Sequence, residues 1–436
     1  MADATTTANM FTERLRVAER ARREKEGKFP GLARLIDVAA LKRAYDRLRP
    51  DAAVGVDGVS KVEYGQGLEK RLVDLHARLV DKRYRHQPIL RVYVPKEDGR
   101  QRPIGISTVE DKLVQGAIRE VLDLVYEPSF YEGSYGFRPK RSAHDAIRRL
   151  KGVVDRGGVR YILEADIVSY FDSLVRSKLM EMLQTRVADG SMLRLIGKCL
   201  HVGVLDGEEY AEPDQGTAQG SGLSPILGNI YLHHVLDMWF EQEVKPRLRG
   251  RAYLIRYADD FLIGFEQQQD AMRVMEVLPK RMGKYGLTLH PDKTRVLEFK
   301  PPSGDQGKGT STFDFLGFTF YWMRTLRGGW RMWCKTRRVR LRRAMKRIYD
   351  FCRKNRHAPV KEQHTRIVQR LVGHYNYFGV NGNGRSMMLL WHWAKKAWFK
   401  WLTRRSQRTR LTWQRFHGLL KALWLPMPQI KVQIWT

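Results

Sequence analysis

The chain has 436 residues, of which 43% are hydrophobic and 11% aromatic, so it is long enough for several structural units. Its formal net charge of +32 points to a polyanionic partner, with nucleic acid as the first candidate. No apolar run approaches the roughly 18 residues of a membrane span, and the opening residues lack a secretory signal. The cysteines Cys199, Cys334 and Cys352 are too scattered for a disulfide framework or a zinc site, so we expect a globular protein of a reducing cytoplasm with no membrane partner.

The first part of the chain predicts several helices and one pair of strands. A glycine-punctuated turn lies at residues 54–60, and residues 89–107 predict two strands around a turn at Gly99. Helical patterns cover residues 10–28, 31–48, 68–79 and 109–125.

The middle of the chain predicts further strands with polar residues at their ends. The stretch YILEADIVSYFDSL (161–174) predicts a buried strand that ends near Asp166, followed by a turn into a helix. A helix begins near Pro225, a strand pair surrounds Asp259 and Asp260, and a further helix precedes GLTLHPDKTRVLEF (286–299). After a loop at 301–309, the stretch FDFLGFTFYW (313–322) predicts one more strand, and we find no internal repeat.

From Lys335 onward the pattern is helical and basic. Beyond Phe315 the only acids are Asp350 and Glu362. One buried helix face is predicted from the apolar spacing of Val339, Leu341, Met345, Ile348, Tyr349 and Cys352. The aromatic residues suit either a helical core, which we favour, or contact with phosphates and bases; they are Trp391, Trp393, Trp398, Phe399, Trp401 and Trp413.

The stretch LIRYADDFLIGF (254–265) places Asp259 and Asp260 between two apolar runs. An ordinary hairpin turn would account for this pattern, and an N-cap role would account for Asp166. Alternatively, the three carboxylates converge at one sheet edge, where they would repel one another unless a divalent cation were present. Mg²⁺ prefers oxygen ligands, and two such ions roughly 4 Å apart can stabilise both oxygens of a phosphoryl transfer.

Nine stretches in this order make the chain resemble the reverse transcriptases encoded by group II introns, in the form that lacks a C-terminal HNH endonuclease. They are VGVDGVS, VPKEDGRQRPIGIST, YGFRPKRSAHDAI, EADIVSYFD, GTAQGSGLSPILGNIYLHHVLD, IRYADDFLIGF, GLTLHPDKTRV, FDFLGF and LVGHYNYFGV. The resemblance covers the chain from about Arg34 to the C-terminus.

The resemblance implies an α+β right-hand polymerase of fingers, palm and thumb, with a ferredoxin-like palm and a helical thumb that is also the maturase domain. The implied parts are an N-terminal extension (1–60), fingers and palm (61–325), thumb or maturase domain X (326–400) and a basic DNA-binding-like segment (401–436). The stretch Arg404–Phe416 fits that last segment, although a nonspecific basic tail is an equal alternative.

The resemblance also implies roles for individual residues. Asp166, Asp259 and Asp260 would be the catalytic aspartates and the ligands of two Mg²⁺ ions, with Mn²⁺ as a possible substitute. Phe171 would exclude a 2′-hydroxyl, although Tyr170 or Phe171 can also be read as core. Further nucleotide contacts are implied for Lys96, Arg102, Gln219 and Lys293, and a primer grip for Phe315, Leu316 and Gly317.

Lys96 and Arg102 can also be read as surface residues, and the glycine-rich stretch around Gln219 as a structural loop. This chain has Ala218 where related sequences often have proline.

The implied function is Mg²⁺-dependent, RNA-directed DNA synthesis, together with intron RNA binding, splicing assistance and retrohoming in a prokaryotic cytoplasm. Its partners would be intron RNA or another RNA template, a DNA primer or target, and dNTPs. The alternatives are a domesticated relative in phage defence, repair or spacer acquisition, and a maturase that binds RNA without needing catalysis. RNA synthesis is the weakest alternative, because a large ring at Phe171 would reject ribonucleotides.

Overall fold

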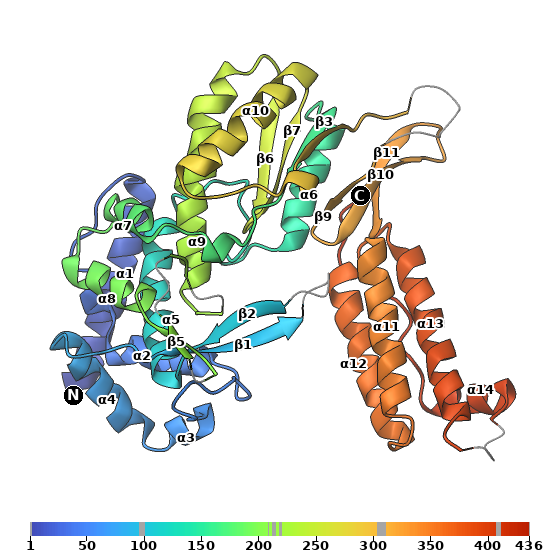
Figure 1. Ribbon diagram of the computed structural model, residues 1–436, viewed down its shortest axis with the longest axis horizontal. Coiled ribbons are helices and arrows are strands. Elements are labelled where there is room, and N and C mark those ends of the chain that lie inside the picture. The colour runs from blue at the N-terminus through green and yellow to red at the C-terminus, as the bar shows by residue number, and fades with distance from the viewer. Residues whose placement is uncertain are drawn as a thin grey trace.

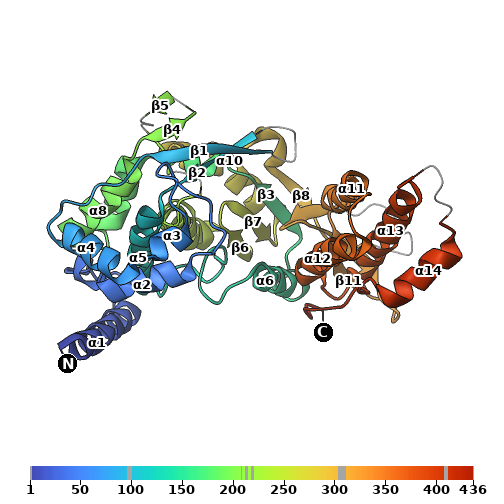
Figure 2. The same cartoon turned by 90° about the horizontal axis from the view of Figure 1, so that it is seen from below.

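A computed structural model describes residues 2–95, 101–207, 209–211, 215–217, 220–302, 311–406 and 411–435, with the backbone alone for residues 2–9 and 11. The described residues form a mixed α/β structure with two four-stranded sheets and one three-stranded sheet. The N-terminal helices lie at one end of the molecule and the C-terminal helices at the other, with the sheets between them (Figures 1 and 2).

The N-terminal end is built from helices. They are α1 (Ala2–Arg23), η1 (Ala33–Leu35), α2 (Val38–Arg47), α3 (Lys61–Gly65), α4 (Leu68–Val80) and α5 (Val109–Tyr126). Three of them, α2, α3 and α5, have a side-chain N-cap. The predictions at 68–79 and 109–125 are confirmed. The single helix predicted over 31–48 is wrong, because Gly31 is left-handed at φ 64° and the Asp37 side chain accepts from the amide of Ala40 to start α2.

The first sheet has the order β2-β1-β4-β5. Its strands are β1 (Ile89–Pro95), β2 (Gln101–Ile106), β4 (Val204–Asp206) and β5 (Glu209–Ala211). The antiparallel pairing of β1 with β2 confirms the predicted strand pair, and Gly99 lies outside the described residues.

The central sheet has the order β6-β7-β3-β8, and each neighbouring pair is antiparallel. Its strands are β3 (Tyr161–Ala165), β6 (Ala252–Tyr257), β7 (Asp260–Phe265) and β8 (Arg295–Glu298). Alternate side chains enter two cores: Ile263 faces helices α9 (Ser224–Leu232) and α10 (Gln268–Lys284), whereas Leu262 faces α6 (Ala143–Asp155). Strands buried on both faces explain why the sequence there is almost continuously apolar.

Helices on the α9 side complete the larger core. The short helix η2 (Tyr170–Asp172) follows β3 and leads to α7 (Arg176–Gln184) and α8 (Gly190–Leu200). Helix α9 begins near Pro225 as predicted and continues through the π-helical turns η3 (His233–Asp237) and η4 (Trp239–Val244) into η5 (Lys245–Arg247). Another short helix, η6 (Pro291–Lys293), precedes β8.

The third sheet corrects one prediction. Residues 313–322 were expected to form one strand, but they form β9 (Phe313–Phe315) and the start of β10 (Phe318–Arg324), which pair antiparallel. Leu316 and Gly317 make the turn, with φ of 50° and 79°. Strand β11 (Trp330–Thr336) completes the sheet beside β10, so the predicted boundary at 325/326 falls in the turn between two paired strands.

The helical part consists of α11 (Arg338–Lys354), α12 (Val360–Phe378), α13 (Gly384–Thr403) and α14 (Trp413–Ala422). Ile348 and Cys352 of α11 are buried as predicted, but Val339 is 49% exposed because it lies in the first turn of the helix. Among the aromatic residues, the core interpretation is confirmed for Trp398, which is fully buried. It is wrong for Trp393 and Trp413, which are 41% and 43% exposed, although Trp413 stacks on Phe399.

The C-terminal segment returns to the sheets. Its Trp435 is 5% exposed and donates from Nε1 to the Met332 carbonyl of β11 at 2.5 Å, so this side chain is packed in the core. No helix among the described residues is long and apolar enough to cross a bilayer.

Candidate active site

Strand register places two of the predicted aspartates opposite each other. Ala165 of β3 pairs with Phe261 of β7 in an antiparallel ladder. Asp166 directly follows Ala165, and Asp260 directly precedes Phe261, so the next opposing positions along the ladder are these two aspartates. Both share the face of the sheet used by Ile162 and Leu262.

The third aspartate lies in the tight turn of the β6–β7 hairpin. Tyr257 pairs with Asp260, which leaves Ala258 and Asp259 as the two turn residues. Ala258 has φ of 57°, a left-handed conformation that such turns usually assign to glycine or asparagine. The pattern is therefore both a hairpin turn and a cluster of acids.

The electrostatics of these carboxyl groups show that they act on one another. Desolvation by the surrounding protein, together with the charges of Asp259 and Asp166, raises the pKa of Asp260 to about 7. Desolvation also raises the pKa of Asp259, as does the charge of Asp166, while the nearby Arg102 opposes the shift. Placing like charges together is unfavourable unless a cation joins them.

Asp166 has a cationic partner in Lys293. The Lys293 Nζ lies 2.5 Å from the Asp166 Oδ2, and the His290 amide donates to the Asp166 carbonyl at 2.8 Å. The loop that contains η6 is thus attached to the end of β3. No three His, Cys, Asp or Glu side chains in the described part of the chain are grouped closely enough to hold a metal ion. The donor chemistry nevertheless fits Mg²⁺, since the coupled groups are carboxylates.

The two aromatic residues after Asp166 have different environments. Tyr170 is 3% exposed and donates its hydroxyl to the Gly228 carbonyl of α9 at 2.6 Å, so it belongs to the core. Phe171 is half-buried, and its carbonyl accepts from the Thr217 amide at 2.8 Å. Its position beside the glycine-rich loop leaves part of the ring accessible.

The other predicted nucleotide contacts are only partly described. Arg102 is exposed on β2 and close enough to Asp259 to act on its pKa. Gly220 has φ of 109°, and a Cβ atom there would lie 2.6 Å from the Gly105 carbonyl of β2, so the loop needs glycine to approach this strand. Lys96 and Gln219 lie outside the described residues.

The β9–β10 turn reaches the same site. Phe315 is buried, and the backbone of Leu316 hydrogen-bonds the Asp260 carboxylate, which lowers the pKa of Asp260 and so opposes the larger upward shift. The Tyr377 hydroxyl of α12 donates to the Leu316 carbonyl at 2.8 Å, and the Arg337 amide donates to that of Gly317 at 2.9 Å. The three predicted primer-grip residues therefore adjoin the aspartates.

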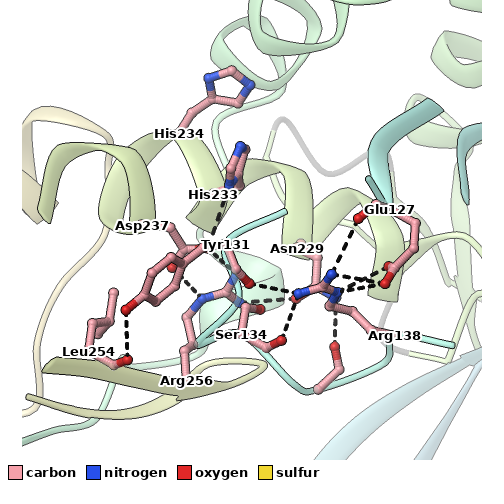
Figure 3. A network of polar contacts seen from close by, with 12 residues as sticks. Glu127, Tyr131, Ser134, Arg138, Asn229, His233, His234, Asp237, Leu254 and Arg256 are labelled. Carbon is pink, nitrogen blue, oxygen red and sulfur yellow. Dashed lines mark hydrogen bonds and ion pairs between the residues drawn. The ribbon is translucent and has the colours of Figure 1, made fainter. Parts of the chain in front are cut away.

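A buried polar network around Arg256 (Figure 3) contacts the aspartate turn through the Ala258 carbonyl, and our reading of the sequence missed it. Arg256 is fully buried; its Nε and Nη2 donate to the two carboxylate oxygens of Asp237 at 2.8 and 2.6 Å. Its Nη1 donates to the Asn229 side chain and to the Ala258 carbonyl, both at 3.0 Å. The available signal was an arginine inside an apolar strand, a position where charge is rare unless it is paired.

The described geometry is a mixed α/β structure with acids at the end of β3 and in the β6–β7 turn. The comparisons show the family to which this arrangement belongs. Residues 94–320 match the family described as reverse transcriptase (RNA-dependent DNA polymerase). This chain belongs to that family, and the resemblance predicted from the motifs is confirmed.

Two of the three relatives described next carry intron-related names. The group II intron-encoded protein LtrA of Lactococcus lactis subsp. cremoris is 32% identical over 267 residues, covering 59% of this chain and 44% of that protein. Protein YkfC of Escherichia coli (strain K12) is 33% identical over 273 residues, covering 56% of this chain and 71% of that protein. The nuclear intron maturase 4 of Arabidopsis thaliana is 30% identical over 128 residues, covering 29% of this chain and 16% of that protein. The match with LtrA thus spans less than half of that relative.

Proposed function

We propose that this protein is an RNA-directed DNA polymerase of the group II intron type, and that Asp166, Asp259 and Asp260 are its catalytic aspartates. The observation that carries the proposal is the register of β3 and β7, which brings Asp166 opposite Asp260 beside the turn that holds Asp259. Membership of the reverse transcriptase family supports the same reading.

The three carboxylates would hold Mg²⁺, as two ions with Mn²⁺ as a substitute. Bound metal would offset the negative charge that develops on the transferred phosphoryl group and its leaving oxygen. The chain's own contribution is to place the carboxyl groups near one another. Desolvation raises the pKa of both Asp259 and Asp260, and the charge of Asp166 raises both further. Lys293, now paired with Asp166, is a cation that would be available to the leaving pyrophosphate.

The nucleotide would lie between β2, the glycine-rich loop and Phe171. Arg102 would contact the triphosphate together with Lys96, and Gln219 would lie against the nascent base pair. Phe171 would exclude the 2′-hydroxyl, because its ring is held in place by the packing of η2 on α9 while one side stays accessible. Leu316, with Phe315 and Gly317, would hold the primer end.

In this proposal the parts form a right hand. The first sheet (β2-β1-β4-β5) and its helices are the fingers. The central sheet (β6-β7-β3-β8) with α6 and α10 is a ferredoxin-like palm, and helices α11–α13 are the thumb. The N-terminal extension covers residues 1–60, and residues 401–436 are the basic DNA-binding-like segment, although Phe416 and Trp435 pack in cores.

The helical part would also bind intron RNA and assist splicing. Helix α11 exposes Arg338, Arg342 and Arg347, and its one acid is Asp350. A basic helix of this kind suits phosphate contacts, whose strength would fall steeply with salt. A domesticated role outside an intron would use the same chemistry with another RNA template.

The test is primer extension by the purified protein on an annealed RNA template, with dNTPs or rNTPs and with or without Mg²⁺. Asp259→Asn should abolish synthesis, whereas Asp51→Asn, which removes a carboxylate whose side chain is 80% exposed, should not. Synthesis from dNTPs that survives in Asp259→Asn would refute the assignment of the aspartates. A wild-type protein that makes no DNA but promotes splicing would favour a maturase that needs no catalysis.

A further inference from the structure

The loop that precedes α6 is unusually rigid for an exposed connection. Arg138 is 7% exposed, and its Nη1 donates to the carbonyls of Tyr131 and Ser134 at 2.7 and 2.8 Å. Its Nε and Nη2 contact the Glu127 carboxylate at the end of α5 at 3.0 and 2.9 Å (Figure 3). A guanidinium with this many partners attaches the loop to the end of α5 and restricts the conformational freedom of the loop.

The same loop is docked onto the strand that leads to the aspartate turn. The Arg256 amide donates to the Gly133 carbonyl and the Tyr135 amide donates to the Arg256 carbonyl, both at 2.8 Å. The Asn229 side chain, which also binds Arg256, donates to the Gly136 carbonyl at 2.7 Å. The loop therefore behaves as an additional edge of the catalytic sheet.

Gly136 is in direct contact with the turn itself. A Cβ atom at this position would lie 2.3 Å from the Ala258 nitrogen, a distance that no side chain could tolerate. Only glycine permits this approach. The next residue, Phe137, is thus held one peptide away from the turn that carries Asp259.

Phe137 combines exposure with backbone strain. Its side chain is 44% exposed and its φ is 59°, a left-handed value that is a genuine outlier for a bulky residue. Its carbonyl accepts from Arg119 at 3.3 Å, and no aromatic ring elsewhere in the described ranges packs against it. The ring belongs to none of the three core clusters, while Gly136 and Arg138 fix the backbone on either side of it. Such backbone strain is concentrated at functional sites.

We propose that Phe137 is a nucleobase platform: its ring packs against a base of the template strand as that strand passes the catalytic turn. Every base has a π-face, so an aromatic ring can support any template sequence without hydrogen-bond readout. The inference rests on the proposed function, since it needs a primer–template at the aspartates. The rigid loop would reduce the entropy lost when the base is bound.

Equilibrium binding of a labelled DNA primer annealed to an RNA template, without dNTPs, tests the proposal. Phe137→Ala should raise the Kd about tenfold, because one base–aromatic contact has roughly that effect. Phe137→Trp should bind like the wild type. The control is Leu326→Ala in the β10–β11 turn, which removes a fully exposed apolar side chain and should leave the Kd unchanged. Thermal unfolding of each variant should show that Phe137→Ala stays folded.

Templates with a single abasic position locate the contact. At one position near the primer end, removal of the base should raise the wild-type Kd and eliminate the difference between wild type and Phe137→Ala. An unchanged Kd in Phe137→Ala, or a difference that persists at every abasic position, would overturn the platform while DNA synthesis by the wild type still supports the polymerase. Wild-type protein that neither binds nor extends the primer–template would overturn both.

Discussion

Replacing Arg256 by methionine tests whether a buried ion pair supports the turn that carries Asp259. Arg256 and Asp237 are both fully buried and joined by two hydrogen bonds of 2.8 and 2.6 Å. Burial alone would raise the pKa of Asp237, but the Arg256 charge and the hydrogen bonds hold it below its ordinary value, so the carboxylate is ionised at neutral pH. Methionine would leave that charge in the core without its partner.

The expected loss follows from this arrangement. Breaking a buried pair by removing one member costs about 3–5 kcal/mol, and a domain of ordinary stability has only about 5–15 kcal/mol in total. The lost Nη1 bonds to Asn229 and to the Ala258 carbonyl would add to the effect. Ordinary domains melt at about 45–65 °C, and a loss of this size would lower the melting temperature substantially. We therefore expect Arg256→Met to be close to unfolding at 37 °C.

Denaturant unfolding of the wild type, Arg256→Met, Asp237→Leu and the double variant separates charge from packing. The double variant should be more stable than either single variant, because it leaves no unpaired charge. It should still synthesise DNA more slowly than the wild type, since the Ala258 carbonyl lacks its donor. A loss of unfolding free energy below about 1 kcal/mol in Arg256→Met, which is within the ordinary range for any substitution, would refute the reasoning. So would a double variant whose loss equals the sum of the losses in the two single variants.

Three further predictions concern titration and strain. The pKa of Asp260 is about 7 in the folded protein and about 3.9 in the unfolded chain, so the folded state binds more protons between these pH values and its stability falls as the pH rises through them. The melting temperature of Asp260→Asn in metal-free buffer should therefore exceed that of the wild type by a margin that grows from pH 5 to pH 8. A margin that stays constant over this range would contradict the prediction. Burial lowers the pKa of His374 to about 4, and its Nε2 has no hydrogen-bond partner among the described residues. The unfolded state then binds more protons between about pH 4 and 6.5, so the wild type should lose stability as the pH falls through this range. His374→Phe keeps the stacking on Phe378 and should lose less unfolding free energy between pH 7 and pH 5, as measured by urea unfolding at the two pH values. Phe137→Gly should be more stable to urea than Phe137→Ala by about 1 kcal/mol, because only glycine relieves the left-handed backbone; equal midpoints would argue against strain there.

Most of the elements could be predicted from the sequence because their signals are local. The helices at 68–80 and 109–126, the β1–β2 pair and the hairpin around Asp259 follow from periodicity and turn residues within a few positions. The errors also have local causes. The strand predicted over 313–322 looked continuous because its turn, Leu316 and Gly317, contains an apolar residue that gives no polar break.

The long-range contacts could not be read in the same way. Nothing near Arg256 in the sequence indicates that its partners are Asn229 on α9 and Asp237 on the π-helical extension of that helix. Nor does the sequence around Trp435 indicate that its indole donates to the Met332 carbonyl of β11. Such pairings depend on chain segments that are far apart in sequence and meet only when the sheets pack.

The sequence alone determined the family, the mixed α/β class and the candidate aspartates, because acids at strand ends and an ordered series of motifs are properties of short segments. Only the tertiary structure decided which groups act on those aspartates: Lys293 on Asp166, the Leu316 turn on Asp260, and the Arg256 network beneath Ala258. The physical reason is that a charge's partner and its desolvation are set by packing in three dimensions, and neither is encoded in the few residues around it.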